Sequence, residues 1–82
     1  MSLDIGLQQD VARLLETRLK ITVPDPATDL IAEGLLDSLG LVELFVALEE
    51  QFGAVVDVDD LDFDDLRSVE AISRYVERTR PR

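Results

Sequence analysis

The sequence predicts an all-α protein: a small bundle of three main helices plus one short helix, with a long loop between the first and second helices. Three segments space their apolar residues at helical intervals, and no segment alternates apolar and polar residues as a half-buried strand does. A chain of 82 residues has room for one small core. We therefore expect a single domain over residues 1–82.

The first helix is expected from Leu3 to about Lys20. Its apolar residues fit one helical face: Leu7, Val11, Leu14, Leu15 and Leu19. Pro24 and Pro26 follow, and proline both disfavours helix and pushes the residue before it towards extended backbone. The long loop therefore covers Ile21 to Leu36. We expect it to pack on the core through four apolar residues: Leu30, Ile31, Leu35 and Leu36.

The second helix is expected to open at Asp37-Ser38 and to run to about Phe52. Both opening residue types are good N-caps, and Gly53 is a typical C-terminal stop. The apolar residues of the predicted core face are Leu44, Phe45, Leu48 and Phe52.

A short helical turn or two is expected within the acidic stretch from Asp57 to Asp65. Ser68 can then cap a last helix from Val69 to about Arg78. The buried face expected for this helix consists of Val69, Ile72, Tyr75 and Val76.

Composition excludes several classes of function. The chain has no Cys and no His, so disulfides, the usual zinc sites and Ser–His–Asp or Cys–His catalytic groups are absent. Its net charge is −10, and a surface of this sign repels nucleic acid and anionic membranes. No stretch is typical of a signal peptide or a membrane span, so we expect a cytoplasmic protein without membrane insertion.

The acidic charge is concentrated in the middle of the chain. From Ile21 to Leu66 there are 13 Asp and Glu residues and no Lys or Arg. Repulsion among these charges opposes folding. The same negative charges attract proteins with basic docking patches. For an arbitrary acidic protein, solubility alone is the favoured explanation, and the two explanations do not exclude each other.

The start of the second helix holds the residues of greatest functional interest. Taken alone, Ser38 is most simply a helix cap. Gly40 lies in the first turn, where glycine weakens a helix, so it suggests the close approach of another group. A second apolar stripe, edged by acids, also runs along this helix: Leu39, Val42 and Val46 beside Glu43, Glu49 and Glu50. The stripe is either further core or a surface that docks into a partner's groove.

Residues 33–53, EGLLDSLGLVELFVALEEQFG, closely resemble the signature of acyl carrier proteins, whose central motif is Asp-Ser-Leu. The long preceding loop, the chain length and the acidic balance fit the same family. Leu39, Val42 and Glu43 are similar to the fatty-acid type, which commonly has an acidic residue where this chain has Gly40. The opening EGLLDS and closing QFG also resemble stand-alone D-alanyl and other aminoacyl carriers.

The resemblance implies a function for each matching residue. Ser38 would carry 4′-phosphopantetheine, a covalent cofactor taken from coenzyme A, between the flanking residues Asp37 and Leu39. The cofactor thiol would hold an acyl or aminoacyl group as a thioester, so the chain would be a carrier and not an enzyme. The implied partners are a phosphopantetheinyl transferase, an acyl- or aminoacyl-loading ligase and a downstream transferase. The chain itself is expected to be a monomer. The implied partner-binding residues are Val42, Glu43, Val46, Glu49 and Glu50.

Two alternatives belong to other classes. One is an acidic helical interaction module in which Ser38 is only a cap. The other is a carboxylate-based calcium-binding protein, although the acidic stretch lacks the central Gly and terminal Glu of an EF-hand loop. The carboxylates concerned are Asp57, Asp59, Asp60, Asp62, Asp64 and Asp65.

Overall fold

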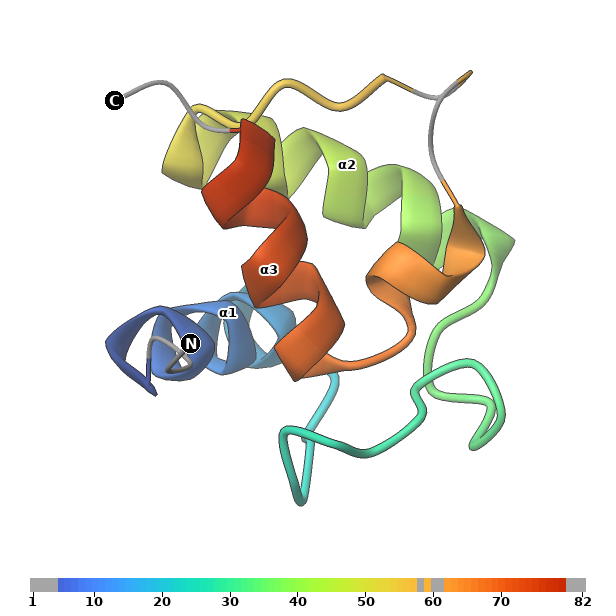
Figure 1. Ribbon diagram of the computed structural model, residues 1–82. Helices are drawn as coiled ribbons and strands as arrows, with labels where there is room; N and C mark the ends of the chain where they lie inside the picture. Colours follow the sequence, from blue (N-terminus) through green and yellow to red (C-terminus); the bar gives the residue numbers. More distant parts are fainter. Residues whose placement is uncertain (1–4, 58, 60–61, 80–82) are drawn as a thin grey trace.

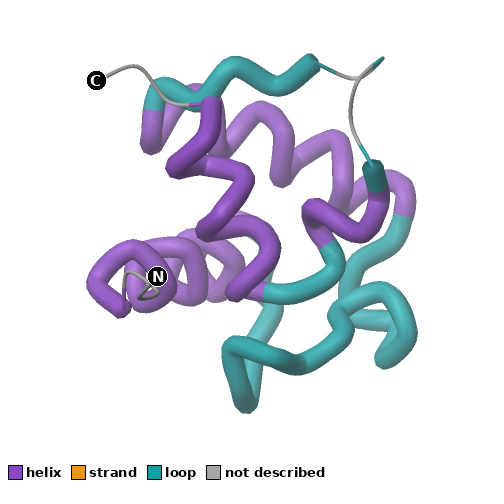
Figure 2. Tube along the Cα trace, in the orientation of Figure 1, coloured by secondary structure: helices purple, strands orange, loops and turns teal. Residues whose placement is uncertain are grey.

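The computed structural model describes residues 5–57, 59 and 62–79. In these residues all regular structure is helical, in the order α1, α2, η1, α3 (Figures 1 and 2), which confirms the all-α prediction. Helix α1 spans Ile5–Arg18, α2 spans Ser38–Phe52, the 3₁₀ turn η1 spans Phe63–Leu66, and α3 spans Val69–Thr79. No helix in the described part of the chain is long and apolar enough to cross a membrane.

Helix α1 ends slightly earlier than predicted, at Arg18 and not at Lys20. Lys20 adopts a left-handed backbone conformation, with φ 60°, which cannot continue a right-handed helix. The Ile21 N–H then donates to the Leu15 carbonyl at 3.0 Å, and the same carbonyl accepts from the Leu19 N–H at 3.1 Å, so both bonds close the end of the helix. The predicted start at Leu3 lies outside the described residues.

Helix α2 has the predicted bounds and the predicted stop. Gly53 adopts φ 67°, and its N–H donates to the Glu49 carbonyl at 3.1 Å. The face that α2 buries is centred on Leu44 and Leu48, both inaccessible to solvent. Phe45 and Phe52 lie at its edges and are only partly buried.

The predicted short turn is present as η1, which begins within the predicted stretch and ends one residue beyond it, at Leu66. Asp62 caps η1: its carboxylate accepts from the Asp64 N–H, while the Asp65 carboxylate accepts from the Asp62 N–H. Among the described residues of the predicted stretch, Phe63 to Asp65 belong to the turn. Helix α3 begins as predicted, because the Ser68 hydroxyl oxygen accepts from the Ala71 N–H at 3.1 Å.

The core lies where α1 packs on α2 and α3, and where η1 packs on α3. The predicted faces of α1 and α3 are buried, apart from Leu19, which is partly buried against the core. In Figure 1, η1 lies near the N-terminal end of α2. The largest side chains that are fully buried are Leu15, Leu30, Leu44, Leu48, Leu66 and Ile72.

The long loop is hydrogen-bonded to the start of α3. The Leu30 N–H donates to the Arg67 carbonyl at 2.6 Å, and the Glu70 N–H donates to the Pro26 carbonyl at 3.1 Å. Leu30 and Leu36 are buried as predicted. The same prediction is wrong for Leu35, which is 38% exposed: both Leu35 and Leu36 donate to the Leu30 carbonyl, and this tight turn directs only one of them to the core.

Candidate functional site

Asp37 and Ser38 have different roles at the start of α2. Asp37 has extended backbone and is the N-cap, because its carboxylate accepts from the Gly40 N–H at 2.8 Å. Ser38 is the first helical residue and is exposed. Its hydroxyl has no hydrogen-bond partner among the described residues. Asp37 and not Ser38 is therefore the cap, so the alternative in which Ser38 is only a cap is wrong.

Gly40 leaves room for this cap. A Cβ at position 40 would lie 3.1 Å from Leu36 Cδ1 and 3.2 Å from the capping Asp37 Oδ1. The close approach predicted from the glycine is confirmed, and the approaching groups come from within the chain. Gly40 thus lets Leu36 enter the core while Asp37 reaches the helix backbone.

A cavity of about 290 Å³ opens beside Ser38. Its apolar wall comes from the long loop and the first turn of α2, and its charged walls are Asp37 and Arg67. The full lining is Ile31, Leu36, Asp37, Ser38, Leu41 and Arg67. A larger cavity of about 350 Å³ lies between α1 and the C-terminal end of α2 and does not include Ser38.

The second apolar stripe of α2 faces solvent. Leu39 is 77% exposed, Val42 57% and Val46 46%. The alternative in which the small bundle buries this stripe is therefore wrong. The exposed stripe and the exposed Glu43 and Glu49 form one surface, C-terminal to Ser38 along the same helix.

Glu50 differs from the other two glutamates on this surface. Its Oε1 lies 2.6 Å from Arg18 Nη2, so its carboxylate already pairs with α1. Arg18 and Glu50 are both substantially exposed, and such a surface pair contributes little stability. Glu50 therefore offers a partner less unpaired charge than Glu43 or Glu49.

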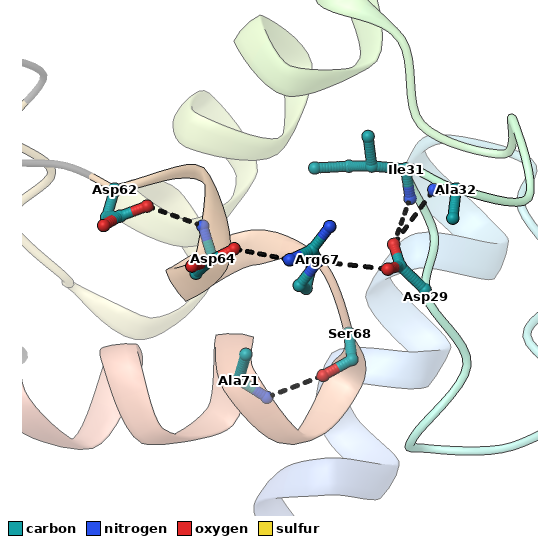
Figure 3. Close-up of polar contacts among 8 residues, drawn as sticks. All are labelled: Asp29, Ile31, Ala32, Asp62, Asp64, Arg67, Ser68 and Ala71. Carbon is teal, nitrogen blue, oxygen red and sulfur yellow. Dashed lines mark hydrogen bonds and ion pairs between the residues drawn. The ribbon is translucent and has the colours of Figure 1, made fainter.

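Arg67 is the residue at the site that sequence reasoning missed. It follows η1, and its guanidinium lies between Asp64 and Asp29 (Figure 3): Nε is 3.1 Å from Asp29 Oδ2, and Nη1 is 2.5 Å from Asp64 Oδ1. Its place beside Ser38 depends on tertiary packing. One signal was available in the sequence, because Arg67 is the only basic residue from Ile21 to Ser73.

The acidic stretch has structural roles in the described residues. Asp62 and Asp65 form the capping box of η1, while Asp64 pairs with Arg67 and Asp65 with Arg78. No group of three or more potential metal ligands occurs in the part of the chain that the structure describes, and Asp60 lies outside that part. The carboxylates are thus used to shape the turn and to hold two arginines.

Comparison with known sequences identifies the family. The family described as "Phosphopantetheine attachment site" matches residues 9–76, and the chain belongs to it. The family is defined by covalent attachment of 4′-phosphopantetheine, and its members are carriers and not enzymes. An exposed serine hydroxyl beside an open cavity fits such a cofactor.

Several relatives are D-alanyl carrier proteins. That of Abiotrophia defectiva is 32% identical over 74 residues, which cover 88% of this chain and 94% of that protein. That of Bacillus velezensis is 46% identical over 41 residues, 50% of this chain and 53% of that protein. That of Bacillus subtilis is 41% identical over 44 residues, 54% of this chain and 56% of that protein. The chain thus matches only about half the length of the two Bacillus relatives.

Proposed function

We propose that this chain carries an aminoacyl or acyl group as a thioester on a 4′-phosphopantetheine arm attached to Ser38, and that it delivers this group between partner enzymes in the cytoplasm. The observation that carries the proposal is the free, exposed Ser38 hydroxyl beside a carboxylate that already caps the helix. Because capping does not need Ser38, its oxygen can be consumed in a covalent bond without loss of the helix start.

Attachment requires chemistry that the chain does not supply. The Ser38 oxygen would bond to the pantetheine phosphorus of coenzyme A as the pyrophosphate bond breaks, and adenosine 3′,5′-bisphosphate would leave. The serine proton would pass to a base of the transferase. The chain's own contribution is to present the hydroxyl at a helix start, where free N–H groups favour an attached phosphate.

The proposed partner surface is the exposed stripe of α2 with its acidic edge. Leu39 and Val42 would supply apolar contact, and Glu43 would attract a basic patch and speed the encounter. Val46, Glu49 and the Arg18-paired Glu50 would extend the surface towards the end of the helix. Moderate contact of this kind suits a carrier that must leave each enzyme after transfer.

An aminoacyl cargo, D-alanine in particular, is favoured over a fatty acyl cargo. The support comes from the relatives, which are named D-alanyl carrier proteins. Gly40 agrees, since fatty-acid carriers resembling this chain commonly have an acidic residue there. Under this proposal the loading partner is a ligase that activates an amino acid.

Intact-mass measurement tests the attachment. The protein is incubated with coenzyme A and a phosphopantetheinyl transferase, and it should gain the mass of one phosphopantetheine. Ser38→Ala should gain none while keeping its helical circular dichroism. Ser68→Ala is the matched control: Ser68 also starts a helix, but its hydroxyl caps α3, so this variant should melt lower and still be modified. Modification of Ser38→Ala would refute the assignment.

Cargo is tested on the modified protein. It is offered labelled D-alanine with a D-alanine-activating ligase, or a labelled fatty acid with a fatty-acid-activating ligase, each with ATP. D-alanine should be incorporated and then released by hydroxylamine, as expected of a thioester. Loading by the fatty acid alone would overturn the aminoacyl proposal and leave the carrier role intact.

A further inference from the structure

The one basic residue in the middle of the chain lies in the wall of the cavity that contains Ser38. From Ile21 to Ser73 only Arg67 carries a positive side chain, against 14 acidic residues, the 13 up to Leu66 plus Glu70. The other lining residues are apolar except for Ser38 itself and the carboxylate of Asp37. Any anion held at Ser38 therefore has one positive neighbour within this cavity.

Arg67 is held in place from two directions. Its guanidinium contacts Asp29 of the long loop and Asp64 of η1, and its carbonyl accepts from the Leu30 N–H. These contacts use Nε and Nη1. Nη2 donates no hydrogen bond to any residue that the structure describes. A guanidinium has five N–H donors, so donors remain for a further acceptor.

We propose that Arg67 binds the phosphodiester of the arm, so that the cavity wall anchors the group joined directly to Ser38. This inference rests on the proposed attachment at Ser38. The phosphodiester carries one negative charge, and its two free oxygens match the planar fork of a guanidinium. Asp37 forms another part of the wall, and its charge repels the phosphate towards Arg67.

The two carboxylates that pair with Arg67 would compete with the phosphodiester to different extents. The Asp29 side chain is 35% exposed and that of Asp64 is 69% exposed, so the contact with Asp64 is the more open to competition. The phosphodiester would occupy the free Nη2 and share or displace Asp64 at Nη1. Asp29 would keep the guanidinium in the cavity wall throughout.

A purely structural role for Arg67 makes a different prediction. If Arg67 only joins the long loop to η1, its replacement destabilises the unmodified and the modified protein equally. If Arg67 also binds the phosphodiester, its replacement destabilises the modified protein more than the unmodified protein. The test therefore compares the change in melting temperature on modification between variants, and this comparison cancels the loss of the Asp29 contact, which is present before and after modification.

The experiment uses the wild type, Arg67→Gln, Arg67→Lys and Arg74→Gln, each before and after complete modification verified by mass. Arg74 is the matched control, an exposed arginine of α3 with no hydrogen bond or ion pair to another described side chain. The modification-dependent shift of Arg67→Gln should fall below that of wild type by about 2–4 °C, since a partly exposed charged contact has this effect in a small domain. Arg67→Lys should retain part of the shift, and Arg74→Gln should match wild type. The difference should shrink at about 1 M NaCl, where charges are screened within about 3 Å.

The wild type provides a second measurement that needs no variant. On modification, the NMR signal of the Arg67 Nε–H group should move more than that of Arg74. Equal shifts in melting temperature for wild type and Arg67→Gln, or an unmoved Arg67 signal if that variant does not fold, would overturn the inference. Absence of the mass gain in the wild type would instead refute the attachment itself.

Discussion

Replacing Asp37 with Ala isolates the cap of α2 from the serine beside it. The variant removes the acceptor that lies 2.8 Å from the Gly40 N–H and leaves that donor to water. Loss of an N-cap carboxylate costs about 1 kcal/mol, within a range of about 0.5–2 kcal/mol. In a domain of this size, about 1 kcal/mol lowers the melting temperature by about 4–8 °C.

The assay is a reversible thermal melt of the unmodified protein, followed by far-ultraviolet circular dichroism. Asp37→Asn is the matched control, because its amide oxygen can still accept from the helix backbone, and it should retain most of the stability. Ser38→Ala should change the unfolding free energy by less than about 0.5 kcal/mol, as expected of an exposed side chain without a partner. If Ser38→Ala were as costly as Asp37→Ala, or Asp37→Ala cost nothing, the division of roles at this helix start would be wrong.

Three further predictions concern the faces and the charge of the bundle. Leu48→Ala should lower the free energy of unfolding by about 2–5 kcal/mol, because it empties a fully buried site, whereas Val46→Ala on the exposed face of the same helix should change it by less than about 0.5 kcal/mol. Similar losses for the two variants in chemical denaturation would contradict the assignment of one buried and one exposed face to α2. Glu43→Lys should slow phosphopantetheine transfer at low salt and less at high salt, whereas the defect of Val42→Asp should persist at high salt; folded variants modified at the wild-type rate would exclude this docking surface. Added NaCl, or millimolar calcium or magnesium alike, should raise the melting temperature by screening the acidic middle of the chain; a marked preference for calcium would indicate a dedicated site, and no response would show that repulsion is negligible.

The helices were predictable because each buries a face through residues close together in sequence. Leu7, Val11 and Leu14, for instance, specify the buried side of α1 by spacing alone. Where two candidates compete for one position, spacing is not enough. Asp37 and Ser38 are equally good caps by residue type, and only the backbone geometry assigns the bond to Asp37.

Features that depend on contacts between distant segments were missed. Leu35 and Leu36 are adjacent and identical in type, yet hydrogen bonds to the Leu30 carbonyl leave one exposed and one buried. Arg67 reaches the site because the loop, η1 and α2 meet there, and local sequence does not encode that meeting. The residues of the candidate site on α2 were thus predictable from the sequence, whereas Arg67 was not.

The hydrogen bonds between the long loop and the start of α3 have a consequence for the order of folding. Each joins residues about forty positions apart, Leu30 to Arg67 and Pro26 to Glu70, so neither can form until the chain entropy of a large closed loop has been lost. The helices can begin from local contacts, but the cavity beside Ser38 is completed only when the long loop and Arg67 have come together. We therefore expect a nascent or partly folded chain to present the serine without its surroundings, so that a transferase reading those surroundings would act only on chains that have completed their fold.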